Sequence, residues 1–216
     1  MAQKLTKRDI AAFIINLFIF VSELIVIINK FPTADGSEFR YYTFLSNLMG
    51  MAAAVLFMLS AFTGFRKLIR AKTILRFYAT CMLTFTFIVV VAVLTPMAMS
   101  VQMDPAFLYA EDAAFFQHVA HPLLSMISFI FLEDNRALNK KQPLYMLLLT
   151  FLYTLILIIL NIMRIVTDGP YPFFQVYVFP VWFIIAWIVG LAGFNYLMNY
   201  LIYRAGTRKN RITSRR

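Results

Sequence analysis

Several residues whose side chains can do chemistry lie inside long apolar runs of this chain. The ionisable ones are Glu23, His118, His121 and Arg164. An ionisable side chain in hydrocarbon costs at least about 2.5 kcal/mol on insertion scales, so each of them is a candidate functional residue. Neutral polar residues share the same runs: Thr43, Ser46, Asn47, Ser125 and Asn161.

A hydroxyl and a histidine among these residues suggest nucleophilic catalysis. A hydroxyl is a poor nucleophile until a base removes its proton, and histidine is the usual base near neutral pH. Thr43 and His121 supply this pair. Asn47 lies one helical turn from Thr43 and is a donor of the kind that stabilises an oxyanion. These residue types predict an acyl-transfer site.

The same residues have other interpretations. Glu23 and Arg164 could neutralise each other between helices, and together with His121 they could form the proton relay of a carrier. Thr43, Ser46 and Asn47 could be interhelical hydrogen-bonding residues. A non-catalytic protein that binds or transports a lipid or solute is therefore the alternative function.

The two histidines also raise the question of metal and cofactor binding. His118 and His121 are three residues apart and share a helix face, so they could hold a metal ion with Glu23 as a third ligand. Haem with two histidine ligands needs them on facing helices, and the chain has no other histidine. No Lys lies within an apolar run, which argues against a retinal Schiff base. We expect neither a metal nor a cofactor.

The elements that must position these residues are membrane-spanning helices. Hydrophobic residues make up 62% of the 216 residues and charged residues 14%, against about 45–50% and 25% in a soluble domain. Runs of about 20 apolar residues mark spans. They predict an all-α polytopic membrane bundle in one domain, 1–216, with kinks at Pro96 and Pro180 and with six transmembrane helices near 10–28, 42–62, 74–97, 113–132, 144–166 and 174–203.

The basic residues predict the orientation of these spans. The formal net charge is +10, but the basic residues lie between and beyond the apolar runs, which argues against nucleic acid as a partner. Seventeen of the 20 Lys and Arg residues fall on one side, and only Lys30, Arg40 and Arg164 on the other. The positive-inside rule then places both termini in the cytoplasm. We expect a multi-pass protein of the cell (plasma) membrane, with its basic tail 204–216 against anionic headgroups.

Helix geometry predicts that the polar residues share one depth. With a rise of about 1.5 Å per residue, Glu23 lies about 8–10 Å and His121 about 12 Å below the outer ends of their helices. Thr43, Asn161 and Arg164 fall within a turn or two of the same surface. We expect one polar pocket that opens outward, with no comparable cluster in the inner half.

Three short motifs carry a family resemblance. The stretch Phe39–Leu48 contains a Thr43-Phe44 pair after two aromatic residues, and Gln117–His121 is a His-x-x-His motif in a span that closes with Glu133. Gly169–Phe173 is a Tyr-Pro-Phe sequence before the last span. In order and spacing they resemble the androgen-induced-gene family of six-span membrane proteins and its bacterial relatives.

This resemblance implies an integral membrane hydrolase that cleaves fatty acid esters of hydroxy fatty acids. It assigns Thr43 as the nucleophile and His121 as its partner. Glu23, Asn47, His118, Asn161 and Arg164 would be supporting or binding residues, and Tyr171 would guard the mouth of the pocket. The expected partners are membrane lipids and a lipid-like ester substrate.

Overall fold

The computed structural model is mostly helical in the residues that it describes, which are 6–30, 36–62, 66–110, 113–166 and 171–213. No strand occurs in these ranges. The α-helices are α1 (Lys7–Lys30), α2 (Tyr42–Phe62), α3 (Arg66–Val89), α4 (Thr95–Ser100), α5 (His121–Ile127), α6 (Gln142–Ile162) and α7 (Val181–Thr213). Short 3-10 turns are η2 (Ser37–Arg40), η4 (Pro105–Leu108) and η7 (Pro172–Phe174), and π-helical turns are η3 (Val90–Leu94), η5 (Phe116–Ala120) and η6 (Ser128–Leu132).

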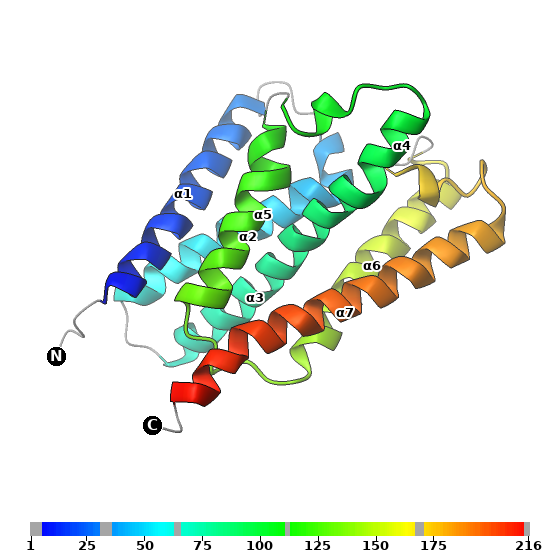
Figure 1. The fold of residues 1–216 in the computed structure, drawn as a ribbon. Coiled ribbons are helices and arrows are strands. Elements are labelled where there is room, and N and C mark those ends of the chain that lie inside the picture. Colours follow the sequence, from blue (N-terminus) through cyan, green and yellow to red (C-terminus); the bar gives the residue numbers. More distant parts are fainter. Residues whose placement is uncertain (1–5, 31–35, 63–65, 111–112, 167–170, 214–216) are drawn as a thin grey trace. The chain divides into compact units, whose positions relative to one another are not determined.

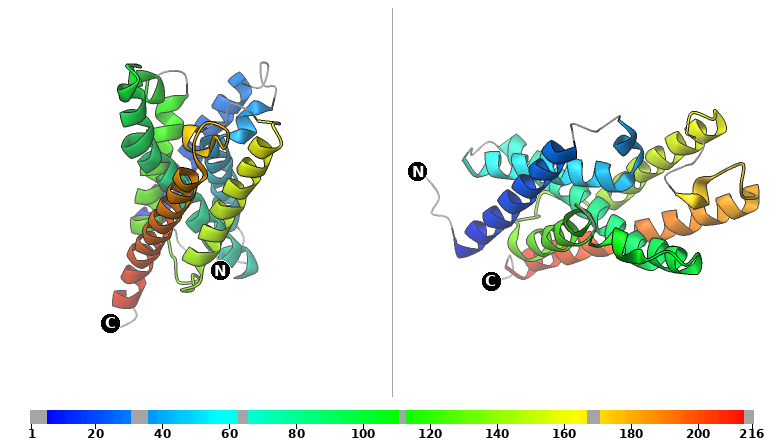
Figure 2. Two further views of the ribbon diagram at one scale, coloured as in Figure 1. Left: turned by 90° about the vertical axis from the view of Figure 1, so that its right-hand side faces the viewer. Right: turned by 90° about the horizontal axis from the view of Figure 1, so that it is seen from above.

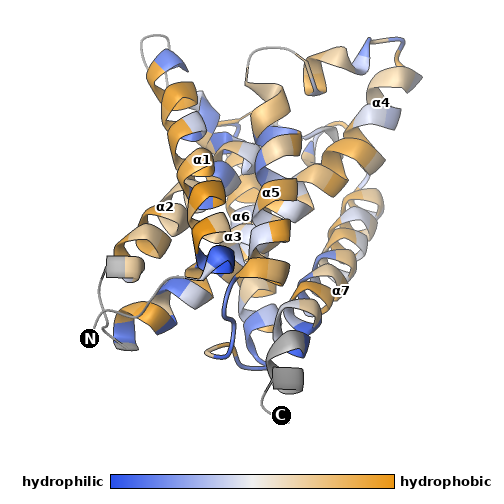
Figure 3. Ribbon diagram, turned by 60° about the vertical axis from the view of Figure 1, so that its left-hand side comes forward, coloured by the Kyte–Doolittle hydropathy of each residue, from blue (hydrophilic) through white to orange (hydrophobic). Residues whose placement is uncertain are grey.

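Five helical stretches among the described residues are long and apolar enough to cross a membrane. They are Lys7–Lys30, Tyr42–Ala61, Lys67–Ser100, Gln142–Ile162 and Val181–Arg208. A sixth apolar helix, Phe116–Leu132, is shorter. Figure 3 shows hydrophobic residues along most of each helix. The expectation of an all-helical, multi-pass membrane protein is confirmed at this level.

Contacts divide the chain into two compact units. The first comprises residues 1–138 and 204–216, and the second residues 139–203. Within the first unit α2 packs against α1 and α3, and α5 packs against α3 and α1 (Figures 1 and 2). These four helices close a ring, so their inward faces form a common interior that holds the candidate site.

Small residues allow close helix contact in this ring. A Cβ atom added to Gly50 of α2 would lie 3.1 Å from Leu83 Cδ1 of α3. Ser46 Oγ and Thr86 Oγ1 hydrogen-bond between the same two helices at 3.0 Å. Small and hydroxyl side chains at such interfaces are typical of membrane helices, because lipid supplies little hydrophobic driving force for association.

Two π-helical turns precede prolines. The backbone N–H of Thr95 bonds Val90 O before Pro96, and that of His121 bonds Phe116 O before Pro122. Proline lacks an N–H and its ring crowds the carbonyl four residues earlier, so the helix widens by one residue ahead of it. The π-turn η3 lies directly before Pro96, one of the two predicted kink positions, and η5 directly precedes His121.

The second unit contains α6, η7 and the first part of α7. The predicted last span began at residue 174 with a kink at Pro180. The structure corrects this, because α7 begins at Val181 and Pro180 O accepts from Phe183 N at 3.0 Å. Proline fits the start of a helix, where no backbone N–H is needed.

Candidate functional site in the first unit

His121 lies between a serine and an asparagine. Its Nε2 is 2.7 Å from Ser22 Oγ of α1, and its Nδ1 is 2.8 Å from Asn47 Oδ1 of α2. The His121 side chain is 0% exposed. A hydroxyl, an imidazole and an amide oxygen in this order have the arrangement of a nucleophile, a base and an orienting group.

The hydrogen bonds of Asn47 assign the tautomer of this histidine. Asn47 Nδ2 donates to the backbone carbonyls of Thr43 at 2.9 Å and Gln117 at 3.2 Å, so its Oδ1 must face the ring. An acceptor at 2.8 Å requires a proton on Nδ1. In a neutral ring Nε2 is then an acceptor, directed at the Ser22 hydroxyl.

Ser22 is positioned by its own helix. Its Oγ is 2.6 Å from the Phe18 carbonyl of the preceding turn. A hydroxyl has one proton, which can point to Phe18 O or to His121 Nε2. The second orientation is the one from which the proton can pass to the histidine.

Glu23 is the acidic residue of the site. It is 0% exposed, its Oε1 accepts from Gln117 Nε2 at 3.0 Å, and its Oε2 lies 3.6 Å from His121 Nδ1. Gln117 thus contacts two neighbours of His121, because its backbone carbonyl accepts from Asn47. The five side chains of the site come from α1 (Ser22 and Glu23), α2 (Asn47), η5 (Gln117) and α5 (His121).

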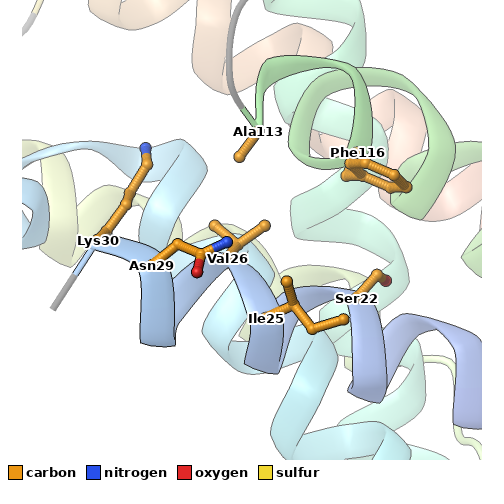
Figure 4. Close-up of a pocket in the computed structure, with 7 residues that line it drawn as sticks. All are labelled: Ser22, Ile25, Val26, Asn29, Lys30, Ala113 and Phe116. Carbon is orange, nitrogen blue, oxygen red and sulfur yellow. The ribbon is translucent and has the colours of Figure 1, made fainter.

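A pocket of about 480 Å³ opens at Ser22. Its volume falls in the range of small-molecule sites. Ile25, Val26, Ala113 and Phe116 give it apolar walls (Figure 4). The remaining lining residues are Ser22, Asn29 and Lys30, all on α1. The pocket therefore combines a hydroxyl, an apolar surface and a cationic group along one helix.

The structure brings together His121, Asn47 and Glu23 but not the two members of the predicted catalytic pair. Between the described residues Thr43 and His121 there is no hydrogen bond, and both ring nitrogens of His121 are occupied by Ser22 and Asn47. Thr43 contributes its backbone carbonyl, which accepts from Asn47 and from Ser46 Oγ.

His118 has a different environment from His121. Its Nδ1 is 2.6 Å from the Leu108 carbonyl, so it anchors the segment that contains η4. Among the described residues there is no group of three or more His, Cys, Asp and Glu side chains that could hold a metal ion.

Asn161, Arg164 and Tyr171 belong to the second unit. Asn161 Nδ2 donates to Val166 O at 2.7 Å, and its Oδ1 accepts from the Val176 backbone N–H at 2.9 Å. The Arg164 guanidinium lies 4.8 Å from the centre of the Tyr177 ring. Tyr171 is buried, and its ring stacks on Phe173. Part of the Gly169–Phe173 motif, residues 169 and 170, lies outside the described residues.

A second polar cluster occupies the interior of the same ring, which corrects the expectation of a single polar cluster. Arg76 Nε and Nη2 donate to Glu133 Oε1 at 2.9 and 2.7 Å, and both side chains are at most 1% exposed. Ser128 Oγ donates to the same oxygen at 2.9 Å, and Arg8 Nη2 donates to the Glu133 backbone carbonyl at 3.0 Å. Arg76 Nη1 reaches Ser125 Oγ, one turn beyond His121, at 3.4 Å.

Ser22 was not predicted as a site residue, although the sequence contains one signal for it. It directly precedes Glu23, which was a candidate, and so lies at the same depth in the membrane.

Comparison of the chain with protein-family models, with curated proteins and with solved structures gives no significant match, so the family resemblance rests on its motifs alone.

Proposed function

We propose that this protein is an integral membrane hydrolase of fatty acyl esters, with His121 as the base and Ser22 as the nucleophile. The observation that carries the proposal is the chain of contacts from Ser22 Oγ through the His121 ring to Asn47 Oδ1, at 2.7 and 2.8 Å. A histidine held in one tautomer, with a hydroxyl at its acceptor nitrogen, is the arrangement that acyl transfer requires.

The reaction proceeds in two steps. The Ser22 proton passes to His121 Nε2 as Oγ bonds to the ester carbonyl carbon. The resulting tetrahedral intermediate expels the alcohol, which takes the proton from Nε2 and leaves an acyl group on Ser22. A water molecule then gives a proton to Nε2 and attacks the acyl carbon, which releases the fatty acid and restores the Ser22 hydroxyl.

The pocket supports an amphiphilic substrate. Lys30 follows Ser22 by eight residues on α1, which is about 12 Å along the helix axis. An ester bond at Ser22 would then leave room for a chain of methylenes along Ile25 and Val26, with an anionic group at the Lys30 ammonium. A fatty acid ester of a hydroxy fatty acid has this form, since its free carboxylate is separated from the ester by such a chain.

The nucleophile is tested by comparing two hydroxyl variants. Purified protein in detergent is assayed with a panel of long-chain acyl esters, as wild type and as Ser22→Ala, Thr43→Ala and His121→Ala. We expect Ser22→Ala and His121→Ala to lose activity by about 1,000-fold or more, and a fluorophosphonate to label Ser22. Loss in Thr43→Ala with full activity in Ser22→Ala would instead support the threonine nucleophile that the family resemblance implies.

Two matched variants control for folding. Ser60 of α2 donates to its own helix at Phe57 O, as Ser22 can to Phe18 O, but has no histidine partner in the structure. Ser60→Ala and His118→Gln should therefore keep near wild-type activity. No hydrolysis by the wild-type protein would contradict the proposal and favour the alternative, a lipid-binding or transport protein, which lipid-binding and proton-flux assays would then test.

A further inference from the structure

Glu23 is a buried acidic residue whose Oε1 accepts a hydrogen bond and whose Oε2 faces His121. Gln117 Nε2 donates to Oε1 at 3.0 Å. Oε2 has no hydrogen-bond partner among the described residues and lies 3.6 Å from His121 Nδ1. A buried carboxylate oxygen without a donor is costly, so its retention in a well-packed interior calls for a reason.

The hydrogen bonds of the resting site do not explain why Glu23 Oε2 is buried without a donor. The Nδ1 proton is already accepted by Asn47 Oδ1 at 2.8 Å, which orients the ring without help from Glu23. Asn47 is neutral, however, and cannot balance the charge of an imidazolium. That charge appears on His121 whenever Ser22 gives up its proton, in an interior where water screens it poorly.

We propose that Glu23 is a positioning residue that stabilises the imidazolium form of His121, while Asn47 fixes the orientation of the ring. Gln117 directs the carboxylate, because its donor bond to Oε1 leaves Oε2 toward Nδ1. The two functions that one aspartate combines in a Ser-His-Asp triad are divided here between an amide and a carboxylate. This inference rests on the proposed hydrolase function.

Two substitutions separate charge from packing. Glu23→Gln keeps the size of the side chain and an oxygen for Gln117, but removes the charge. Glu23→Asp keeps the charge and shortens the side chain by one methylene, which leaves a small cavity. If Glu23 has only a structural role, Glu23→Asp should lower the activity more than Glu23→Gln does. If its charge stabilises the imidazolium, Glu23→Gln should lower the activity more.

The kinetic test measures kcat and KM for the best ester, with the thermal midpoint in detergent as a folding control. We expect Glu23→Gln to lower kcat by about 10-fold or more, to leave KM within about 2-fold, and to retain the midpoint. Glu23→Asp should recover part of the lost kcat. Wild-type kcat in Glu23→Gln, or an aspartate variant no better than the glutamine variant, would overturn the inference.

A second readout does not depend on hydrolysis. ¹⁵N NMR of the His121 ring in detergent, with the signal assigned by comparison with His118→Gln, gives the ratio of imidazolium to imidazole at a fixed pH. We expect this ratio to fall about 10-fold in Glu23→Gln. An unchanged ratio would refute the role of Glu23 even if the ester were hydrolysed, and a wild-type protein without hydrolysis would refute the proposed function while this measurement still decides on Glu23.

Discussion

At the scale of single residues, the interior of the first unit contains ionisable side chains in two separate places. Glu23 and His121 lie next to each other, with His121 hydrogen-bonded to the pocket residue Ser22, and Arg76 and Glu133 form a buried ion pair elsewhere in the ring. The pair is bidentate, and its carboxylate also receives the Ser128 hydroxyl. A buried pair of this kind tolerates loss of one partner poorly, because the other charge is then left uncompensated.

Neutralising one member of the pair should therefore destabilise the fold. We expect Glu133→Gln to lower the free energy of unfolding by about 3–5 kcal/mol, measured by thermal or denaturant unfolding in detergent. Asp134→Asn is the matched control, since the neighbouring Asp134–Arg136 ion pair has side chains 51% and 76% exposed. Exposed pairs contribute about 0–1 kcal/mol. Equal effects of the two substitutions would contradict the assigned role of the buried pair.

Residue types predicted part of the site from the sequence. The residues that were not predicted were missed for physical reasons. Glu23, Asn47 and His121 were candidates because polar side chains in apolar runs are costly. Ser22 was not, since a serine within a helix can satisfy its hydroxyl on its own backbone and so gives no such signal. Arg76 was counted only among the basic residues of the cytoplasmic side, although it lies within the predicted span near 74–97, and its pairing with Glu133 depends on a contact 57 residues apart.

At the scale of elements, apolar run length predicted the helices well and their irregularities less well. The predicted span near 42–62 coincides with α2, and that near 144–166 overlaps α6 (Gln142–Ile162). The π-helical turns were not predicted, because hydropathy does not register one extra residue in a helical turn. Proline marks the location of η3 and η5 by removing a backbone donor, and η6 has no proline beside it.

The turn before Pro122 provides a test of how an element controls the site. Pro122→Ala restores an N–H that can bond His118 O, so we expect η5 to tighten to α-helix and shift Gln117 relative to His121. Ester hydrolysis should fall by about 10-fold or more, without loss of thermal stability. Pro96→Ala relaxes the equivalent turn η3, which supplies none of the site residues, and should keep full activity. Full activity in Pro122→Ala would show that the π-turn is not needed.

Helix contact near the end of the chain is also tight. A Cβ added to Gly206 of α7 would lie 2.8 Å from Phe129 Cε1 and 3.1 Å from Asn135 Nδ2. Asn135 Nδ2 in turn donates to Phe129 O at 2.7 Å. A larger residue at position 206 would therefore force the Phe129 ring to shift where this part of α7 meets the end of the His121 helix.

At the scale of the whole molecule, the chain has the features of a multi-pass membrane protein. Exposed large hydrophobic residues occur along α1, α6 and α7, such as Ile14, Leu152 and Trp182 at 59%, 52% and 71% exposure. Such side chains are stable in lipid and costly in water. The distribution of Lys and Arg along the sequence predicts six spans with both termini in the cytoplasm.

Cysteine labelling tests this orientation. The natural Cys81 is buried, so a Cys81→Ala background leaves no other thiol. We expect Met103→Cys to react with a membrane-impermeant maleimide on intact cells, and Lys140→Cys to react only after the cells are opened. Both parent residues are exposed in the structure. The reverse pattern would invert the topology, and labelling of both on intact cells would mean that the predicted spans do not alternate as proposed.

The Arg76–Glu133 ion pair also bears on how the protein is made. Ribosomes extend a chain by about 5–20 residues per second, so the 57 residues between the partners correspond to roughly 3–11 s of synthesis. During this interval the Arg76 guanidinium lacks the Glu133 carboxylate with which it pairs in the folded protein. We therefore expect a nascent chain that stops short of Glu133 to hold an uncompensated Arg76 charge in the interior of the first unit.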